Sequence, residues 1–411
     1  MFFRNFRILT ISTIFFLITN IAVSALTLDQ ALETANKNNP KTLSSYAMYE
    51  EAKTKVVQKN WLPQPDLMLE YKQIPQEARN PVNAGMYMYG FSQKLPFPYK
   101  LWLSHSSAWN MENRYKYLYE QQAWDTRADV VEAYYKLFFA NRKYEINKSN
   151  LEILKRFKRV SESKYVVGKA AQSDLLTAQI QYELIKNDDE TFKREISLAQ
   201  TALERLLNKN TGGTTESAPK AFDFKLDLEK VKELAQKLNP MLLALKSQKN
   251  SLSDAHALSK FDIIPDIKTT VLQREIPNAG LNGWDFKLSA EIPLWFWSKA
   301  AAINEAGYTQ DIVEQAYLDF KNELNQKVET VYIKLETTVR TDKIYKDSIL
   351  KKTKQALSSA ETAYRADRID FLTLSNAQKM NFDAELAYYK NLVEIEIHKA
   401  RLEALIGGEI K

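Results

Sequence analysis

The sequence contains no cysteine and little of what builds catalytic or metal sites. Of its 411 residues none is Cys, three are His and ten are Gly. Disulfides, thiolate metal ligands and cysteine nucleophiles are therefore excluded. The isolated His105, His256 and His398 form no His-x-x-x-His motif, and no glycine-rich phosphate loop occurs. We therefore expect no catalytic residue, no metal site and no cofactor, and thus a protein that is not an enzyme.

Long apolar runs are also missing, except at the start. Arg4 and Arg7 precede an apolar run from Ile8 to Val23, and Val23-Ser24-Ala25 offers small residues for cleavage. This pattern predicts a secretory signal peptide over residues 1–25. A retained membrane anchor is the alternative, but polar residues interrupt the run at Thr10, Ser12, Thr19 and Asn20. Because no later apolar run reaches about 18 residues, we expect no further membrane-spanning helix.

The charge balance excludes a nucleic-acid-binding surface. The chain carries 57 basic and 51 acidic residues, a net charge of +6, and two of the basic residues lie in the leader. Basic and acidic residues are interleaved rather than clustered. Pairs such as Glu190 and Arg194, four residues apart, indicate solvated helix faces rather than general acid–base pairs.

An internal duplication covers the mature chain. Several short motifs recur in the same order at a spacing of 199 to 200 residues: Asn39-Pro40 and Asn239-Pro240, Pro65-Asp66 and Pro265-Asp266, Tyr165 and Tyr364, Ala178-Gln179 and Ala377-Gln378, Leu203-Glu204 and Leu402-Glu403. The shared order favours two structural repeats. We place them at residues 26–210 and 226–411, joined by a linker over 211–225 that contains Gly212-Gly213 and Pro219.

Each repeat is expected to begin with two helices separated by the Asn-Pro motif. Thr27 to Gln30 matches a capping box and predicts a short helix that ends near Asn39. Pro40 suits the first turn of the next helix, which Pro63 and Pro65 prevent from continuing.

The period of apolar residues then changes to two. In residues 283–292, Trp284, Phe286 and Leu288 alternate with charged or polar residues. This predicts strands at about 65–73 and 84–95, and at about 265–275 and 282–295. Aromatic residues near the strand ends suit a membrane interface, whereas Met68, Met86 and Met88 lie on the other, lumenal face. Ordinary soluble hairpins are the alternative interpretation.

Long helical hairpins complete each repeat, at about 104–207 and 298–406. The first long tract, from Ser104 to about Tyr165, contains no Pro or Gly, and heptad-like apolar stripes predict coiled-coil packing.

Four strands are too few to close a membrane barrel, and unpaired edges in lipid are costly. The fold class expected is therefore mainly α with β: a long helical coiled-coil barrel plus a transmembrane β-barrel completed by trimerisation, about twelve strands from three copies.

These features resemble the TolC-type outer-membrane efflux protein family, over Leu26 to about Gly407. The duplicated Asn-Pro, the Pro-Asp before a strand, and Tyr165 to Gln179 with its second copy carry the resemblance. Residues 91–101 are similar to the heavy-metal efflux branch (CzcC/CusC-like), although Tyr99 stands where that branch has Gly. The resemblance implies a homotrimer in the outer-membrane lipid, a helical tunnel in the periplasm, and docking to a periplasmic adaptor (membrane fusion protein) and an inner-membrane RND-type pump.

The resemblance also implies a periplasmic gate at the hairpin tips, held by polar links between hairpins. The family's positions there correspond to Ser173, Asp174, Tyr364, Arg368, Asp370, Thr373 and Asn376. The linking Arg position holds Ile369, so the adjacent Arg368 is the candidate. The two constriction acids fall on Thr373 and Asn376, which leaves Asp367 and Asp370 as the nearby acids.

The resulting hypothesis is a passive exit duct for substrates delivered by the pump and adaptor, with metal cations as the expected cargo. Two alternatives stay open. One is a periplasmic coiled-coil adaptor or scaffold, and the other is an exit duct for drugs or secreted proteins. We expect no interaction with nucleic acid.

Overall fold

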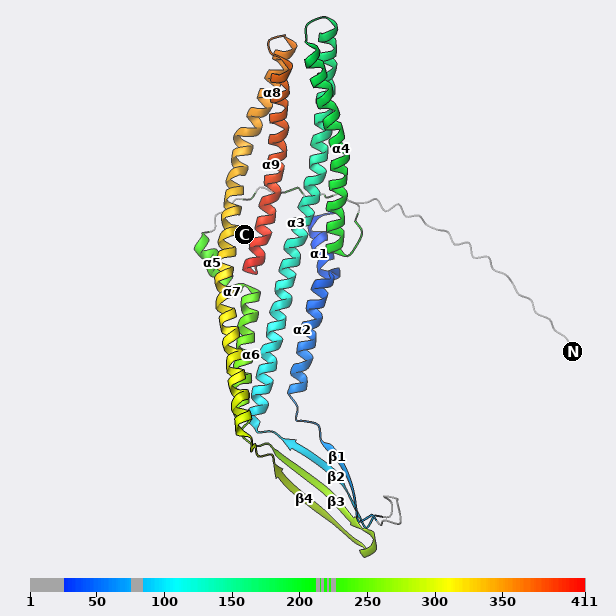
Figure 1. Ribbon diagram of the computed structural model, residues 1–411, viewed down its shortest axis with the longest axis vertical. Coiled ribbons are helices and arrows are strands. Elements are labelled where there is room, and N and C mark those ends of the chain that lie inside the picture. The colour runs from blue at the N-terminus through cyan, green and yellow to red at the C-terminus, as the bar shows by residue number, and fades with distance from the viewer. Residues whose placement is uncertain are drawn as a thin grey trace, which may run out of the picture.

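The structure is a computed structural model that describes residues 26–74, 84–211, 215, 218–219, 222 and 227–410. The expected signal peptide lies outside these residues, as does most of the expected linker. The chain is elongated, with a four-stranded sheet at one end and two helical hairpins that reach the other end (Figure 1). No helix among the described residues is both long and apolar enough to cross a bilayer.

The same order of elements occurs twice, as the duplicated motifs predict. The first repeat consists of α1 (Leu28–Asn38), α2 (Pro40–Lys59), β1 (Asp66–Lys72), β2 (Met86–Leu95), α3 (Pro98–Val166) and α4 (Gln172–Leu207). The second consists of α5 (Leu228–Leu238), α6 (Pro240–Phe261), β3 (Ile267–Ile276), β4 (Leu281–Ala290), α7 (Phe296–Ile344), α8 (Leu350–Arg365) and α9 (Phe371–Ile406). A 3-10 turn, η2 (Pro277–Ala279), joins β3 to β4, and a π turn, η3 (Tyr345–Ile349), separates α7 from α8.

The duplicated Asn-Pro motif joins the short helices to the hairpins. Asn239 Oδ1 accepts a hydrogen bond from the Leu242 amide (2.8 Å), while its Nδ2 donates to the Leu405 carbonyl (2.9 Å) near the end of α9. Asn39 caps α2 and donates to the Leu206 carbonyl (2.9 Å) near the end of α4 in the same way. One buried side chain therefore starts one helix and satisfies the end of another.

All four strands are antiparallel, in the order β1-β2-β3-β4. The register aligns Leu67, Phe91, Val271 and Phe286 across one face. All four are exposed, Phe286 by 68%. The opposite face carries Met68, Leu272 and Asp285 beside Gly90, whose Cβ position lies 1.9 Å from the Val271 carbonyl oxygen. Any side chain at position 90 would therefore disrupt the β2–β3 pairing.

The predicted element boundaries differ most from the structure at the end of the fourth strand and at the starts of the two long helices. The fourth strand ends at Ala290 rather than at 295, because Pro293 cannot donate to a ladder and Trp295 already caps α7. The long helices begin at Pro98 and Phe296 instead of at 104 and 298. The π turn in the second long helix was not predicted.

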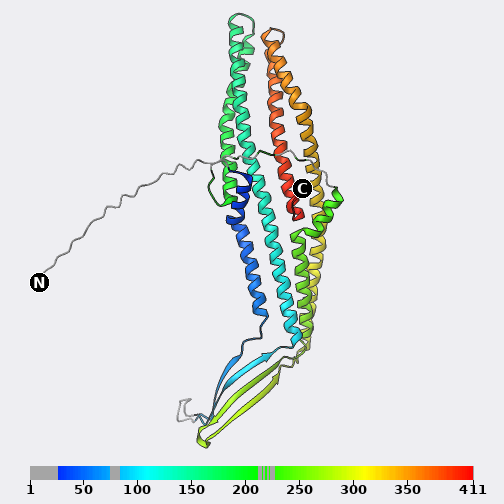
Figure 2. The ribbon, with the colours of Figure 1, turned by 180° about the vertical axis from the view of Figure 1, so that it is seen from behind.

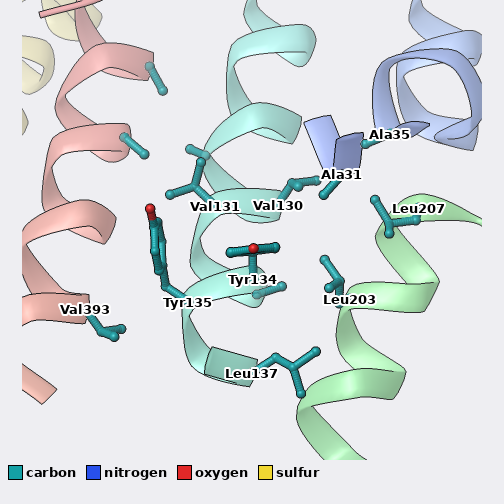
Figure 3. Close-up of a cluster of buried hydrophobic side chains, with 14 residues drawn as sticks. Ala31, Ala35, Val130, Val131, Tyr134, Tyr135, Leu137, Leu203, Leu207 and Val393 are labelled. Atoms are coloured by element: carbon teal, nitrogen blue, oxygen red, sulfur yellow. The ribbon is translucent and has the colours of Figure 1, made fainter. Parts of the chain in front are cut away.

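Three apolar clusters hold the helices together along the long axis. The largest joins α1, α3, α4 and α9 around Tyr134, which is fully buried and donates from its hydroxyl to the Leu26 carbonyl (2.7 Å). Figure 3 shows Tyr135 facing Val393 of α9 while Leu203 and Leu207 of α4 approach α3 from the other side. A second cluster links α5, α7 and α9, and a third lies near the hairpin tips.

We predict that Asn239→Ala lowers the free energy of unfolding by about 1–3 kcal/mol, because it removes a helix cap and leaves the Leu405 carbonyl unsatisfied. Thermal or denaturant unfolding followed by helical circular dichroism measures this. Asn250→Ala, at an exposed position in the middle of α6, is the control and should have little effect. Equal stability of the two variants would contradict the role given to Asn239.

Candidate periplasmic gate at the hairpin tips

The two hairpin tips lie side by side at the end of the molecule farthest from the sheet (Figures 1 and 2). Each tip turns through a residue with left-handed backbone geometry, Gly168 (φ 72°) in the first hairpin and Asp367 (φ 58°) in the second. Asp tolerates this geometry better than most residues with a side chain. The second tip thereby presents a carboxylate where the first presents none.

The Asp367 carboxylate bridges the two hairpins. Its Oδ1 lies 2.5 Å from Lys164 Nζ and its Oδ2 lies 3.2 Å from Lys169 Nζ, both in the first hairpin. Hydrogen bonds from Lys164 and Lys169 lower the pKa of Asp367. Because this pKa is depressed, the link is present above it and is lost as the pH falls through it.

Tyr364 fills the space between the hairpins just below this bridge. It is 4% exposed, its ring packs edge-on against Phe371 (5.9 Å between centroids), and its hydroxyl lies 3.0 Å from Ser161 Oγ. Lys164 Nζ donates to the Tyr364 carbonyl and lies 4.1 Å from the ring centroid. Lys164 therefore binds Tyr364 and Asp367 together.

Asp370 has a local structural role in this chain. It is the N-cap of α9, and its Oδ1 accepts a hydrogen bond from the Thr373 amide (2.9 Å). Hydrogen bonds from the Thr373 side chain and amide lower the pKa of Asp370. Thr373 is exposed on the first turn of α9.

The remaining candidates lie near the tips without joining them. Ser173, Arg368 and Asn376 are exposed, and Asp174 is half-buried in the first turn of α4, where the helix N-terminus favours a carboxylate. Within the described residues, the side chain of Asp174 makes no hydrogen bond to Tyr364. Within one protomer Tyr364 contacts Ser161 and Lys164, and Asp367 contacts Lys164 and Lys169. Sequence reasoning had named Tyr364 and Asp367 but not Ser161, Lys164 or Lys169.

This arrangement of polar contacts can hold the two hairpins together. Among the described residues no group of His, Asp and Glu side chains could hold a metal ion. The contacts are an ion pair, a hydrogen bond between two hydroxyl groups and a cation–π contact, and each joins segments about 200 residues apart in sequence. These contacts join the two long hairpins at their tips, and the sheet lies at the opposite end of the molecule. The chain is therefore a long helical protein whose hairpin tips are held together by polar contacts.

The chain belongs to the outer membrane efflux protein family, whose model matches residues 27–209 and 231–408. These two matched segments correspond to the two repeats. A comparison with curated proteins finds no match.

Solved outer-membrane channels have the same fold. The CmeC channel of Campylobacter jejuni superposes with a TM-score of 0.79 at 14% identity, covering 93% of this chain and 86% of that chain. The open state of the MtrE channel of Neisseria gonorrhoeae gives 0.77 at 17% identity, covering 93% and 89%. CusC, described in terms of transmembrane channel formation, gives 0.77 at 14% identity, covering 93% and 92%.

We predict that Lys164→Met increases amide hydrogen exchange several-fold at both tips, because it removes the bonds from Lys164 to Tyr364 and Asp367 while keeping the aliphatic stem. Mass spectrometry of peptides covering 158–175 and 360–375 measures this. Lys155→Met, which breaks only an exposed pair within α3, is the matched control. Unchanged exchange at the second tip would show that Lys164 does not join the hairpins.

Proposed function

We propose that the chain is one protomer of a trimeric exit duct in the outer membrane. The observation that carries this proposal is a sheet whose apolar face is exposed and whose β1 and β4 edges pair with no further strand among the described residues. In lipid, each unpaired backbone group costs several kcal/mol, so the sheet needs further strands on both edges. Three copies would supply about twelve strands and a lumen.

The helical hairpins then form a tunnel on the periplasmic side of the membrane. The exposed aromatic residues Trp295, Phe296 and Trp297, which are 66%, 69% and 59% exposed, lie where the sheet meets the helices. Such residues are favoured at a membrane–water interface. The tips consequently lie far from the membrane, where an adaptor and an RND-type inner-membrane pump would deliver cargo.

In this duct the contacts of Tyr364 and Asp367 hold the tip closed at rest, and the gate also includes Ser173, Asp174, Arg368, Asp370, Thr373 and Asn376. A partner that competes for Lys164 or Asp367 would loosen the tip without any chemical step. The duct itself is passive, because energy and substrate selection come from the pump.

The cargo is proposed to be metal cations, on the basis of the similarity of residues 91–101 to the heavy-metal branch. Deletion of the gene should then reduce tolerance to divalent or copper-type ions more than tolerance to detergents. Unchanged metal tolerance with increased detergent sensitivity would instead favour drugs as the cargo.

The oligomeric state tests the duct directly. The purified mature chain should need detergent and should have the mass of a trimer by native mass spectrometry. A monomer that stays soluble without detergent would contradict the proposal and would favour a periplasmic scaffold.

We predict that Asp367→Asn and Lys164→Met raise the mean single-channel conductance in planar bilayers several-fold, because each removes the charge bridge between the tips. Tyr364→Phe, which loses only the hydroxyl link to Ser161, and Asp174→Ala should raise it less. In the wild type, conductance should rise as the pH falls through the depressed pKa of Asp367, and Asp367→Asn should abolish this rise. Wild-type conductance in all four variants would remove these residues from the gate.

A further inference from the structure

A pocket of about 360 Å³ lies between the short helix α1, the start of α2 and the middle of α3. Its volume is in the range of small-molecule sites, which begins at about 300 Å³. Leu32 and Ala35 of α1, with Ala123 and Trp124 of α3, give the pocket apolar walls. All the residues that line it belong to the first repeat of one chain, so its walls are complete without a second copy.

Most of the polar side chains in this pocket already have partners. Thr42 Oγ1 lies 2.9 Å from Thr126 Oγ1, and Thr126 Oγ1 also accepts a hydrogen bond from Gln122 Nε2 (3.1 Å). At the rim, Glu33 forms an ion pair with Lys37 (2.6 Å). The hydroxyl groups are therefore satisfied within the chain, and the charges of Glu33 and Lys37 cancel.

Arg127 is the polar residue of the pocket that has more donors than partners. Its Nη2 donates to Glu409 Oε1 (3.0 Å), and its guanidinium lies 5.8 Å from the centroid of the Trp124 ring. Among the described residues, its buried Nε has no acceptor. A buried donor on a charged group is costly to leave unsatisfied, and a carboxylate can accept from two N–H groups of one guanidinium. Arg127 therefore favours a ligand that brings an anionic oxygen into the pocket.

The two repeats can be aligned helix by helix through their matching residues. The Asn-Pro motifs, which recur 200 residues apart, align α1 and α2 with α5 and α6. The buried Val130 and Leu137 of α3 align with the buried Val328 and Leu335 of α7. The alignment therefore shows which residues of the second repeat stand in place of those that line the pocket.

In the second repeat, the chain itself joins the two helices at this place. Gln236 of α5 stands at the position that matches Asn36, and its Nε2 donates to Asn325 Oδ1 of α7 (2.9 Å). Asn325 stands at the position that matches Arg127. In the described part of the first repeat, Asn36 is exposed and forms no hydrogen bond with Arg127. The first repeat thus has a pocket with a charged donor where the second has a direct contact.

We propose that this pocket binds a small carboxylate with an apolar body. The carboxylate accepts hydrogen bonds from the guanidinium of Arg127 and from the amide of Asn36, and the apolar body lies against the ring of Trp124. The bound ligand then joins α1 to α3, as the direct hydrogen bond joins α5 to α7. The site is independent of the gate and of the oligomeric state.

The walls and the charge of the pocket favour this class of ligand over two others. An inorganic anion would bind the guanidinium of Arg127 but would leave the apolar walls without a contact. An amine would bring a second positive charge next to Arg127, and like charges at short distance repel. A carboxylate with an aromatic or aliphatic body satisfies both parts of the pocket.

The probe is 3-phenylpropionate with a fluorine on its ring, titrated into the detergent-solubilised full chain and followed by fluorine NMR. The wild type should bind it saturably. Asn36→Gln/Arg127→Asn, which copies the contact of the second repeat, should bind it at least about tenfold more weakly. Detergent takes up the probe equally in both samples, so the difference between them reports the pocket. Equal affinity in the two proteins would overturn the site.

Glu409→Gln distinguishes a ligand contact of Arg127 from a purely structural role. The change removes the carboxylate that Arg127 already bonds and frees a donor, so the probe should bind as tightly as in the wild type or more tightly. A loss as large as that in the double variant would show that Arg127 only holds the end of the chain. Ala123→Leu keeps Arg127 but fills the pocket, and should weaken binding at least about tenfold. Wild-type affinity in Ala123→Leu would also overturn the site.

Two isosteric probes test the charge of the ligand. The alcohol 3-phenylpropan-1-ol and the amine 3-phenylpropylamine have the same ring and chain length, and both should bind at least about tenfold more weakly than the carboxylate. An alcohol that binds equally well would show that Arg127 does not recognise the ligand. The carboxylate should also raise the melting temperature of the wild type but not that of the double variant, because a ligand stabilises only the protein that binds it. An equal rise in both would contradict the proposal.

Discussion

The backbone edges of a four-stranded sheet are the constraint on which the rest of this structure depends. In the part of the chain that the structure describes, β1 and β4 each pair on one side only, beside an exposed apolar face. In water such an edge invites aggregation, and in lipid it is costly for every unpaired group. In the proposed trimer a closed ring of copies removes both edges at once, and the helical part then follows the same symmetry as the sheet.

The duplication provides that symmetry inside each chain. Asn39 and Asn239 perform the same two tasks, capping one helix and binding the end of another, so each repeat positions its hairpin above its strands in the same way. The duplication does not preserve every contact. Arg114 of α3 bonds to Gln248 of α6, whereas Ile312 and Met48, which stand at the matching positions of the other repeat, are both exposed.

The sequence alone predicted the features that depend on neighbouring residues. It did not predict the contacts between segments that are far apart in the chain. The capping box at Thr27, the Asn-Pro junctions and the alternating strands depend on neighbours within a few residues, and all are confirmed. The bridge from Asp367 to Lys164 joins residues 203 apart, and no periodicity identifies it. Asp370 was considered as a source of gate charge, yet its hydrogen bond to the Thr373 amide is a capping contact that the Asp-x-x-Thr spacing could have indicated. The π turn adds one residue to the second long helical tract relative to the first. The nearly constant spacing of the duplicated motifs does not reveal this extra residue.

A comparison of the two hairpin tips shows which repeat carries the polar contacts. Tyr364 is buried against Ser161 and Lys164. Tyr165, which stands at the matching position of the first repeat, is 42% exposed, and Ala360 and Ala363 stand at the positions that match Ser161 and Lys164. Alanine offers neither a hydroxyl nor a cation. The duplication therefore keeps the tyrosine in both tips but supplies polar partners for only one of them, and those partners join the two hairpins of one chain.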